Sequence, residues 1–473
     1  MAGITSYGAY VPLYRLSRAD ISKAWGIPGP AGEKAVANYD EDTLTMAVAA
    51  GMDCLKDIAP ESVDGVYFAS TSAPYKEKQS ATIIATALGL HKGAITSDFA
   101  NSLRAGTIAL RAALDSVAAG SAKNILVIAS DMRLGAPRGD KEMAFGDGAA
   151  ALLVGNSNNS VDIESTYSIF DEIFDTWRSG NDTFARTSED RFLRDCGHTR
   201  VVPEAISTVM KERNLTQADL SKVVISASDP RQLATAAGKL KLDTKTQVQD
   251  LLYEKIGNTG TALPLMLLVA ALEEAKANDR LLLAAYGDGC DVLVLKASAQ
   301  LEKIKDRRGI KCHLESKKMV SSYQKYMLWR ELIITEPPAR PPIMPVALPA
   351  SWRDRNWGLA LRGSKCKNCG TPQYPMQRVC VMCQSEDQYE PYAFNRRRGN
   401  VFTFSHDNLA GAIDPPSTIT SVDFEGGGRI MCDMTDRDPE EVKTDMPVEM
   451  TFRKLHTVNG VHNYWWKCAP IRC

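Results

Sequence analysis

The feature that most constrains this chain is a pair of CxxC knuckles, formed by Cys366 with Cys369 and by Cys380 with Cys383. Each knuckle can present two thiolates to one tetrahedral ion, and this spacing is typical of a zinc site. Because cysteine occupies all four positions, no coordination position is left for water, and we expect a structural zinc ion that staples a small module. Four unliganded thiols or a redox dithiol are the weaker alternatives. The other seven of the eleven cysteines are expected to be packed thiols in a reducing compartment.

Length and charge narrow the remaining possibilities. With 473 residues the chain is too long for one ordinary core, so we expect two or three domains. Its 56 basic and 57 acidic residues nearly cancel, which argues against nucleic acid as a partner. The N-terminus lacks the pattern of a signal peptide, and no apolar run approaches the length of a membrane span. We therefore predict no membrane association and a cytoplasmic location.

The first 300 residues show an α/β pattern, in which strand-like apolar runs alternate with Ala/Leu-rich helical stretches. A Gly-Asp-Gly turn at residues 146–148 is echoed at residues 287–289, each between two strand-like runs. The echo predicts two similar halves, although two unrelated hairpin turns would produce the same pattern.

Prolines mark the clearest boundary. An amphipathic helix is predicted over residues 315–334, and the proline-rich segment that follows favours extended chain. Beyond the cysteine cluster, strand-like runs at residues 401–405, 418–424, 429–433, 448–453 and 464–467 predict a small Greek-key barrel. We therefore divide the chain into an α/β domain (1–335), a linker (336–350), a helix with a zinc ribbon (351–385) and a barrel (386–473).

The C-terminal part, residues 345–473, resembles the zinc-ribbon and OB-fold accessory proteins of acyl-CoA enzymes. Besides the knuckles, the resemblance rests on LRGSK at residues 361–365, GNVFT at 399–403 and MPVE at 446–449. It implies docking to thiolase-like enzymes and handling of the pantetheine arm of coenzyme A. An OB barrel could also bind oligonucleotides, with His406, Trp465 and Trp466 as stacking residues, but the chain has no basic excess.

The N-terminal part resembles hydroxymethylglutaryl-CoA synthase of the thiolase superfamily. The matching segments are YDEDT at residues 39–43, AGT at 105–107, DTWR at 175–178, GNTG at 257–260 and SYQKYMLWR at 322–330. The resemblance implies a five-layer αβαβα fold, commonly dimeric, that binds a CoA thioester in a narrow tunnel.

At the catalytic positions of that family, this sequence departs from the family's pattern. Where the resemblance places the acyl-accepting cysteine, the glutamate and the histidine, this sequence has Leu103, Thr71 and Ser228. A leucine cannot form an acyl-enzyme. Asn258 does match, and the resemblance implies that it binds substrate by polarising the thioester carbonyl; without the resemblance it would be an ordinary turn residue.

Three functions stay open. The first is a catalytically silent, synthase-like subunit that binds acyl-CoA, forms a homodimer or a hetero-oligomer with a cysteine-bearing thiolase, and serves a carbon–carbon bond forming or cleaving enzyme. The second is a stand-alone aldolase, with Tyr75, Tyr286 and Asp147 as candidates for proton transfer. The third is an acyltransferase with a rebuilt site, for which Ser102 and Cys290 are weak candidate nucleophiles.

Overall fold

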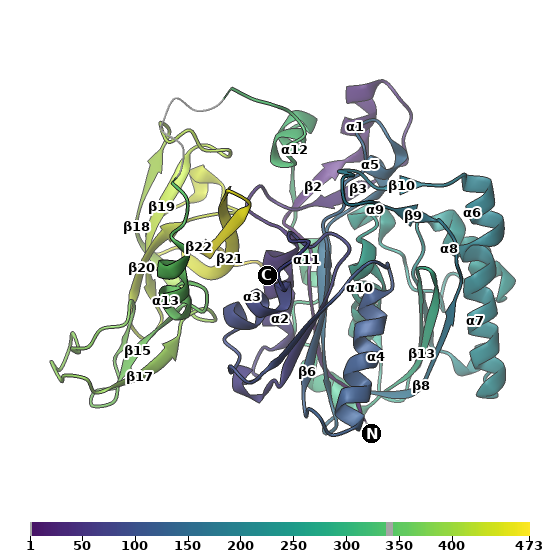
Figure 1. The fold of residues 1–473 in the computed structure, drawn as a ribbon, viewed down its shortest axis with the longest axis horizontal. Helices are drawn as coiled ribbons and strands as arrows, with labels where there is room; N and C mark the ends of the chain where they lie inside the picture. The colour runs from purple at the N-terminus through teal and green to yellow at the C-terminus, as the bar shows by residue number, and fades with distance from the viewer. Residues whose placement is uncertain (1, 337–343) are drawn as a thin grey trace.

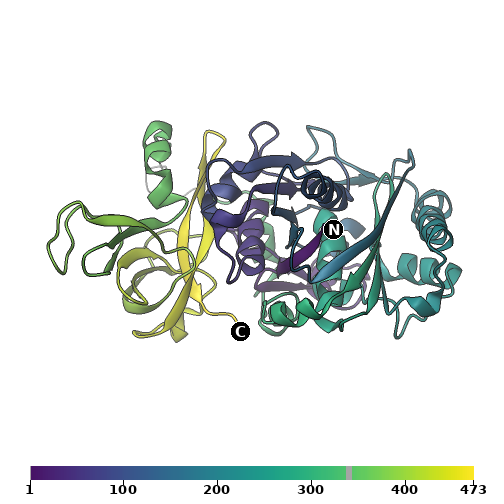
Figure 2. The ribbon, with the colours of Figure 1, turned by 90° about the horizontal axis from the view of Figure 1, so that it is seen from below.

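A computed structural model describes residues 2–336 and 344–473 of the chain. It consists of a large N-terminal module, from strand β1 (Gly3–Tyr10) to helix α12 (Tyr323–Trp329), and a smaller C-terminal module that lies beside it (Figures 1 and 2). Of the predicted linker, residues 337–343 lie outside the described residues. No helix in the described ranges has the length and apolarity that a membrane span requires.

The N-terminal module is built on a mixed sheet whose strands fall into two groups. In spatial order the strands are β11 (Lys222–Ile225), β12 (Arg280–Tyr286), β13 (Gly289–Ala297), β8 (Val161–Phe170), β1 (Gly3–Tyr10), β7 (Gly148–Gly155), β6 (Ile125–Asp131), β4 (Gly65–Ala69) and β5 (Ile95–Phe99). Strands β1 and β8 are joined through only two residue pairs, so the sheet is nearly divided at this point.

The two groups repeat one pattern. In each, a pair of parallel strands (β4 with β6, β11 with β12) is followed by an antiparallel strand (β7, β13) that begins at the last glycine of the Gly-Asp-Gly turn. This topology agrees with the two similar halves predicted from the echoed turns. Tyr286 and Asn258, which lie near these turns, are thereby brought to one edge of the sheet.

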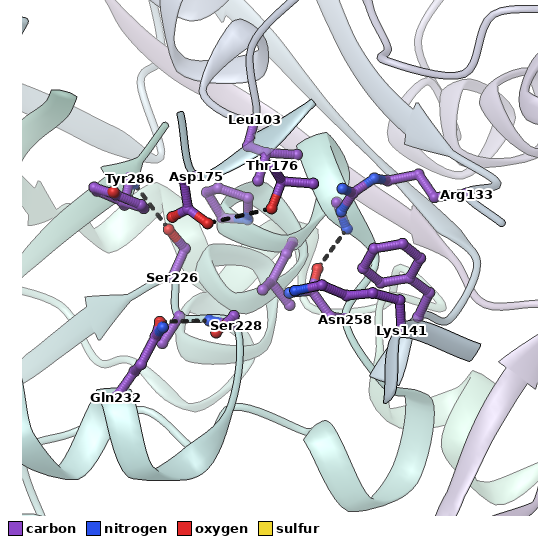
Figure 3. Close-up of a pocket in the computed structure, with 15 residues that line it drawn as sticks. Leu103, Arg133, Lys141, Asp175, Thr176, Ser226, Ser228, Gln232, Asn258 and Tyr286 are labelled. Atoms are coloured by element: carbon purple, nitrogen blue, oxygen red, sulfur yellow. Dashed lines mark hydrogen bonds between the residues drawn. The ribbon is translucent and has the colours of Figure 1, made fainter. Parts of the chain in front are cut away.

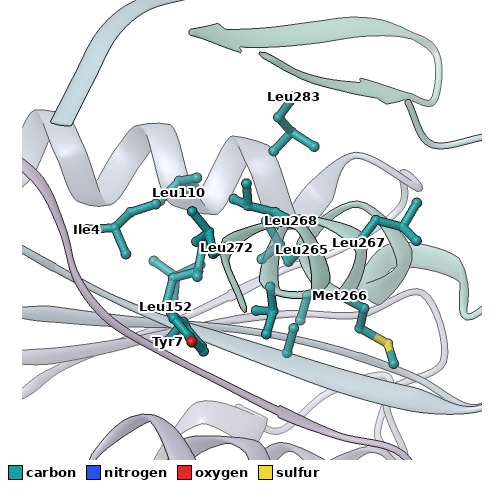
Figure 4. Close-up of a cluster of buried hydrophobic side chains, with 14 of the residues drawn as sticks. Ile4, Tyr7, Leu110, Leu152, Leu265, Met266, Leu267, Leu268, Leu272 and Leu283 are labelled. Atoms are coloured by element: carbon teal, nitrogen blue, oxygen red, sulfur yellow. The ribbon is translucent and has the colours of Figure 1, made fainter. Parts of the chain in front are cut away.

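Helices form the other layers. The apolar helices α4 (Ala105–Ala118) and α10 (Leu263–Glu274) are buried between the two strand groups, and Leu265, Leu268 and Leu272 of α10 pack into this core (Figure 4). The outer faces are covered by α2 (Thr43–Cys54) and α3 (Ser80–Leu88) on one side, and by α7 (His198–Glu212) and α8 (Pro230–Lys239) on the other (Figure 1). The resulting αβαβα arrangement confirms the predicted fold class.

Shorter elements complete this module. They are β2 (Tyr14–Ser17), α1 (Arg18–Trp25), β3 (Glu33–Val36), α5 (Asp140–Ala144), β9 (Thr176–Trp177), β10 (Arg186–Thr187), α6 (Asp190–Cys196), α9 (Tyr253–Ile256), α11 (Lys311–Glu315), β14 (Lys318–Met319) and α12 (Tyr323–Trp329). The helix predicted over residues 315–334 is therefore too long. It begins only after Ser322, whose side chain accepts a hydrogen bond from the backbone N–H of Lys325 and caps the helix.

The C-terminal module contains a helix, a ribbon and a barrel. Helix α13 (Leu348–Gly358) precedes the ribbon strands β15 (Arg362–Cys366), β16 (Pro372–Gln373) and β17 (Tyr389–Ala393). The barrel strands, in spatial order, are β20 (Arg429–Asp433), β19 (Ser417–Phe424), β18 (Arg398–Asp407), β21 (Pro447–Val458) and β22 (Val461–Pro470). All five barrel strands predicted from the sequence are present, because alternate side chains such as Thr420 and Val422 turn inward.

The barrel docks on helix α2 of the N-terminal module. Phe452 and Trp466 of the barrel belong to the same apolar cluster as Leu44 and Leu55 of the α2 region. A disulfide between Cys312 and Cys473 also joins the end of the chain to α11. The expectation of seven packed thiols is therefore wrong for this pair, whose partners lie 161 residues apart and leave no local pattern. Cys196 is likewise exposed rather than packed.

The C-terminal end of α10 carries a pH-sensitive carboxylate. Glu273 accepts a hydrogen bond of 2.7 Å from the backbone N–H of Ile310, and burial raises its pKa from 4.5 to about 7. Between these two pH values the folded chain holds a proton that the unfolded chain has lost, so the free energy of unfolding falls as pH rises. The free energy of unfolding of Glu273→Gln should not show this decrease. We therefore expect the stability of the variant, relative to wild type, to rise by about 2 kcal/mol from pH 5 to pH 8.

Urea unfolding of both proteins at the two pH values measures this gain. Glu274→Gln is the matched control, because the Glu274 side chain is 71% exposed and pairs with Lys222 only at the surface. A Glu273→Gln protein whose stability relative to wild type is the same at pH 5 and pH 8 would contradict the assignment.

Candidate functional site

A pocket lined by both polar and apolar side chains lies where strands β6, β11 and β12 end and where helix α4 begins, at the edge of an α/β sheet that commonly binds ligands (Figure 3). Its volume is about 40 Å³, which is room for about three water-sized groups. The pocket is lined by Leu103, Arg133, Lys141, Phe145, Asp175, Thr176, Ser226, Ala227, Ser228, Gln232, Asn258, Gly260, Leu263, Pro264 and Tyr286.

Of the four positions compared with the catalytic and binding residues of the family, three meet in this pocket. Leu103 precedes helix α4, Ser228 follows strand β11, and Asn258 lies in the turn before α10. The Asn258 side-chain oxygen accepts a hydrogen bond of 2.9 Å from the backbone N–H of Gly260, which holds the side chain against the pocket. The geometry is compatible with the predicted substrate-binding role of Asn258, which stays a prediction.

Thr71, at the predicted position of the family's glutamate, does not line the pocket. Its hydroxyl instead donates a hydrogen bond of 2.8 Å to the carboxylate of Asp131, the last residue of strand β6. Asp131 is fully buried and also accepts hydrogen bonds from Ser70, Ser72 and Thr261. This carboxylate therefore fixes the loop after β4 and has its acceptor positions engaged.

Neither candidate nucleophile is in a position to act in the pocket. The Ser102 hydroxyl donates to the backbone oxygen of Gly287 at 3.3 Å, and within the described part of the chain no basic side chain accepts its proton. Cys290 is fully buried in strand β13, where burial raises the pKa of its thiol above the usual range. A protonated, inaccessible thiol is inert as a nucleophile.

Of the proposed proton-transfer residues, only Tyr286 lines the pocket. Its ring packs edge-on against His198 with centroids 5.2 Å apart, and its buried hydroxyl has no hydrogen-bond partner among the described residues. Burial, and next the negative charge of Asp175, raise the pKa of Tyr286 above its usual range. The Tyr75 hydroxyl instead accepts a hydrogen bond from the backbone N–H of His462 in the barrel. Asp147 forms an ion pair with Arg330.

Two cationic residues of the pocket were not predicted. Arg133 follows strand β6 and stacks on the Phe145 ring, with its guanidinium 4.1 Å from the ring centroid. Lys141 comes from helix α5 and lines the same pocket. Both are single charged residues in or near loops, without the periodicity or spacing that would single them out in a sequence.

The second site is the cysteine cluster of the ribbon. The four sulfur atoms lie within 4.8 Å of one another, and Cys366 to Cys383 and Cys369 to Cys380 are separated by 3.6 and 3.5 Å. A tetrahedral zinc ion with bonds of about 2.3 Å needs neighbouring sulfurs about 3.8 Å apart, so the donor set fits the ion. Gly370, with a φ of 78°, makes the tight turn after the first knuckle.

Four family models match parts of the chain. Residues 97–169 and 210–295 match the 3-oxoacyl-[acyl-carrier-protein] synthase III domain and its C-terminal domain. Residues 359–390 match the rubredoxin-like zinc ribbon domain of ChsH2, and residues 395–453 match its C-terminal OB-fold domain. The zinc ribbon and the OB-fold predicted from the sequence are thereby confirmed.

Known proteins resemble the N-terminal module. Hydroxymethylglutaryl-CoA synthase of Pyrococcus horikoshii is 35% identical over 292 residues, which cover 61% of this chain and 83% of the relative. The solved structure of MvaS in complex with 3-hydroxy-3-methylglutaryl coenzyme A superposes with a TM-score of 0.63 at 20% identity, over 72% of this chain and 94% of that one. 3-Oxoacyl-[acyl-carrier-protein] synthase III of Aquifex aeolicus has a TM-score of 0.54 at 23% identity, over 63% of this chain and all of that one.

Proposed function

Because this chain belongs to the hydroxymethylglutaryl-CoA synthase family, we propose that it is a cysteine-free member that binds an acyl-CoA thioester and serves a carbon–carbon bond forming or cleaving enzyme. The observation that carries the proposal is Leu103, which lines the same pocket as Asn258 and lies just before helix α4. An alkyl side chain there can line a tunnel but cannot accept an acyl group. Any reaction at this pocket therefore proceeds without an acyl-cysteine.

The accessory module supports a role within a complex. A zinc ribbon and an OB-fold like those of ChsH2 are fused to the synthase-like module and share its apolar core. The zinc ion would be structural, since its four ligands leave no open coordination position. We propose that the chain acts with a separate cysteine-bearing thiolase, as a homodimer or a hetero-oligomer, and contributes CoA-thioester binding and a scaffold.

A second candidate function is favoured by Tyr286. In a retro-aldol cleavage, a base takes the proton of the β-hydroxyl group, the bond between Cα and Cβ breaks, and the resulting thioester enolate takes up a proton. Tyr286 and Asp175 lie together in the pocket, where they could exchange these protons, while Asn258 would hold the thioester oxygen. This reaction needs no acyl-enzyme.

One experiment separates the two functions. The tagged full-length chain is purified from its own cells and, separately, made alone, and both preparations are assayed for condensation of acyl-CoA and cleavage of β-hydroxyacyl-CoA. Activity found only with a stoichiometric thiolase partner supports the subunit. Activity of the chain alone that is lost in Tyr286→Phe but kept in Tyr75→Phe, whose hydroxyl lies outside the pocket, supports the aldolase. No coenzyme A binding in either preparation would overturn both.

A further inference from the structure

A second cleft lies between the barrel and helix α2, where the two modules meet (Figure 1). Its volume is about 620 Å³, within the range of about 300–1,000 Å³ that sites for small organic molecules occupy. One wall is formed by the second half of α2 and the residues around α11, and the other by the start of β18, by β21 and by the end of β22. Among the described residues it shares no lining residue with the pocket at the start of α4. The cleft is therefore a separate candidate site.

Five acidic side chains line this cleft in the described part of the chain, and each is engaged within the protein. The Asp53 carboxylate accepts three hydrogen bonds of 2.9–3.1 Å from backbone N–H groups. The other four form ion pairs at 2.5–3.6 Å, namely Asp57 and Asp306 with Arg307, Glu449 with Arg308, and Asp436 with Arg453. These carboxylates therefore do not neutralise the remaining arginines of the cleft.

Two of the remaining arginines lie at the start of β18. Nη1 of Arg396 donates to the backbone oxygens of Leu55 at 2.9 Å and Ile58 at 3.0 Å, while its Nε and Nη2 are buried without a hydrogen-bond partner. Burial lowers the pKa of Arg396, although the charge of Glu61 opposes the change. Arg398 is exposed, and its side chain forms no hydrogen bond or ion pair within residues 2–336 and 344–473. An anion in the cleft would supply the acceptors that these guanidinium groups lack.

A buried histidine gives the cleft a hydrogen-bond acceptor. His313 lines the cleft, and its ring packs edge-on against Tyr10 with centroids 5.2 Å apart. Burial, and next the positive charges of Arg472 and Arg308, lower the pKa of His313 well below its ordinary range, so the ring is neutral at physiological pH. Its Nε2 donates to the backbone oxygen of Ala9 at 3.2 Å, and Nδ1 is buried without a partner. Nδ1 is thus an acceptor, suited to a hydroxyl or amino group of a ligand.

Size and chemistry together narrow the ligand. Met52, Ile58 and Pro470 add apolar surface on which the flat ring of a ligand can lie. A guanidinium pairs with a phosphate group through two parallel hydrogen bonds, which gives both affinity and orientation. The cleft is much larger than a single phosphate group requires. A nucleoside phosphate combines all the required parts, namely a flat base, hydroxyl or amino donors, and phosphate groups.

We propose that the cleft between the modules is a second ligand site, which binds a nucleoside phosphate through Arg396 and Arg398 on its phosphate groups and Nδ1 of His313 on a hydroxyl or amino group. Two sources carry this chemistry, a free nucleotide and the nucleotide half of coenzyme A. The proposal does not depend on the proposed function, because it requires no ligand in the pocket at the start of α4. A bound nucleotide would contact both modules and hold the barrel on α2.

Isothermal titration of the full-length chain with ADP tests this assignment. We expect one ADP to bind, and Arg398→Met to weaken its binding at least about 10-fold, because a charged hydrogen-bond donor to phosphate is lost. Arg398 is exposed, so its replacement leaves the packing of the modules intact. Arg397→Met is the matched control and should bind ADP like wild type, because Arg397 stacks on the Tyr392 ring and lies outside the cleft.

A second titration identifies the source of the nucleotide. If coenzyme A competes with ADP, and Arg398→Met weakens both, the cleft holds the nucleotide half of coenzyme A. If coenzyme A leaves the affinity for ADP unchanged, the cleft takes a free nucleotide. Absence of ADP binding to wild type, or an Arg398→Met protein that binds ADP like wild type, would overturn the site. Pyrophosphate that binds as tightly as ADP would overturn the assignment of a nucleoside.

Discussion

Replacing Cys369 with serine should release the metal from the ribbon and unfold residues 362–393, because three thiolates cannot complete the tetrahedral site. Binding of a structural zinc ion contributes about 10–16 kcal/mol to the folding of small zinc modules, and this ribbon has few strands of its own. We expect the barrel to stay folded, since its core is continuous with the N-terminal module. Zinc content after gel filtration and hydrogen exchange followed by mass spectrometry measure both effects.

Cys196→Ser is the control for this change, because Cys196 is a free, exposed cysteine in the other module. It should keep a full equivalent of zinc and unchanged amide protection in the ribbon. A Cys369→Ser protein that kept its zinc and the protection of residues 362–393 would rule out the four-cysteine site. Loss of protection throughout the barrel would show that the metal supports more than the ribbon.

Patterns that repeat locally were predictable. The five barrel strands follow from alternating apolar residues, and the knuckles follow from four cysteines whose spacing matches one ion. The meeting of Leu103, Ser228 and Asn258 was predicted only through a family resemblance, because these residues lie in three separate turns and share no period. The structure places them in one pocket but assigns them no role.

Features formed between distant segments were not predictable. Arg133 is one charge in a loop, and its significance appears only when Phe145 and the pocket walls surround it. The disulfide joins residues 161 apart, beyond any spacing rule. The helix predicted over residues 315–334 was too long, because its amphipathic pattern continued past both ends of the helix that Ser322 caps.

The YDEDT segment, residues 39–43, has a structural role that the sequence alone did not predict. In the sequence it marks a family resemblance, whereas in the structure it is the surface on which the barrel docks. Arg453 of the barrel forms ion pairs with Asp40 at 3.2 Å and with Glu41 at 2.8 Å, and Lys467 forms an ion pair with Asp40 at 2.9 Å. Asp40 and Arg453 are 413 residues apart, and both side chains are buried. These charges join the two modules.

Arg453→Met should therefore destabilise the chain by about 3–5 kcal/mol, because it leaves Glu41 and Asp436 buried without their cation. Methionine keeps most of the volume of the side chain, so lost packing contributes little. Urea unfolding followed by tryptophan fluorescence reports on the barrel, since Trp466 is fully buried in the shared core.

Arg429→Met provides the comparison within the same barrel. Its partner Asp423 is 44% exposed and Arg429 itself 49% exposed, so loss of that pair should cost no more than about 1 kcal/mol. If both variants unfold at the same urea concentration, the buried charges contribute no more than a surface pair and do not hold the barrel in place. If only Arg453→Met unfolds early, the modules act as one folding unit, and the acidic segment of the synthase-like module is a docking site for its accessory barrel.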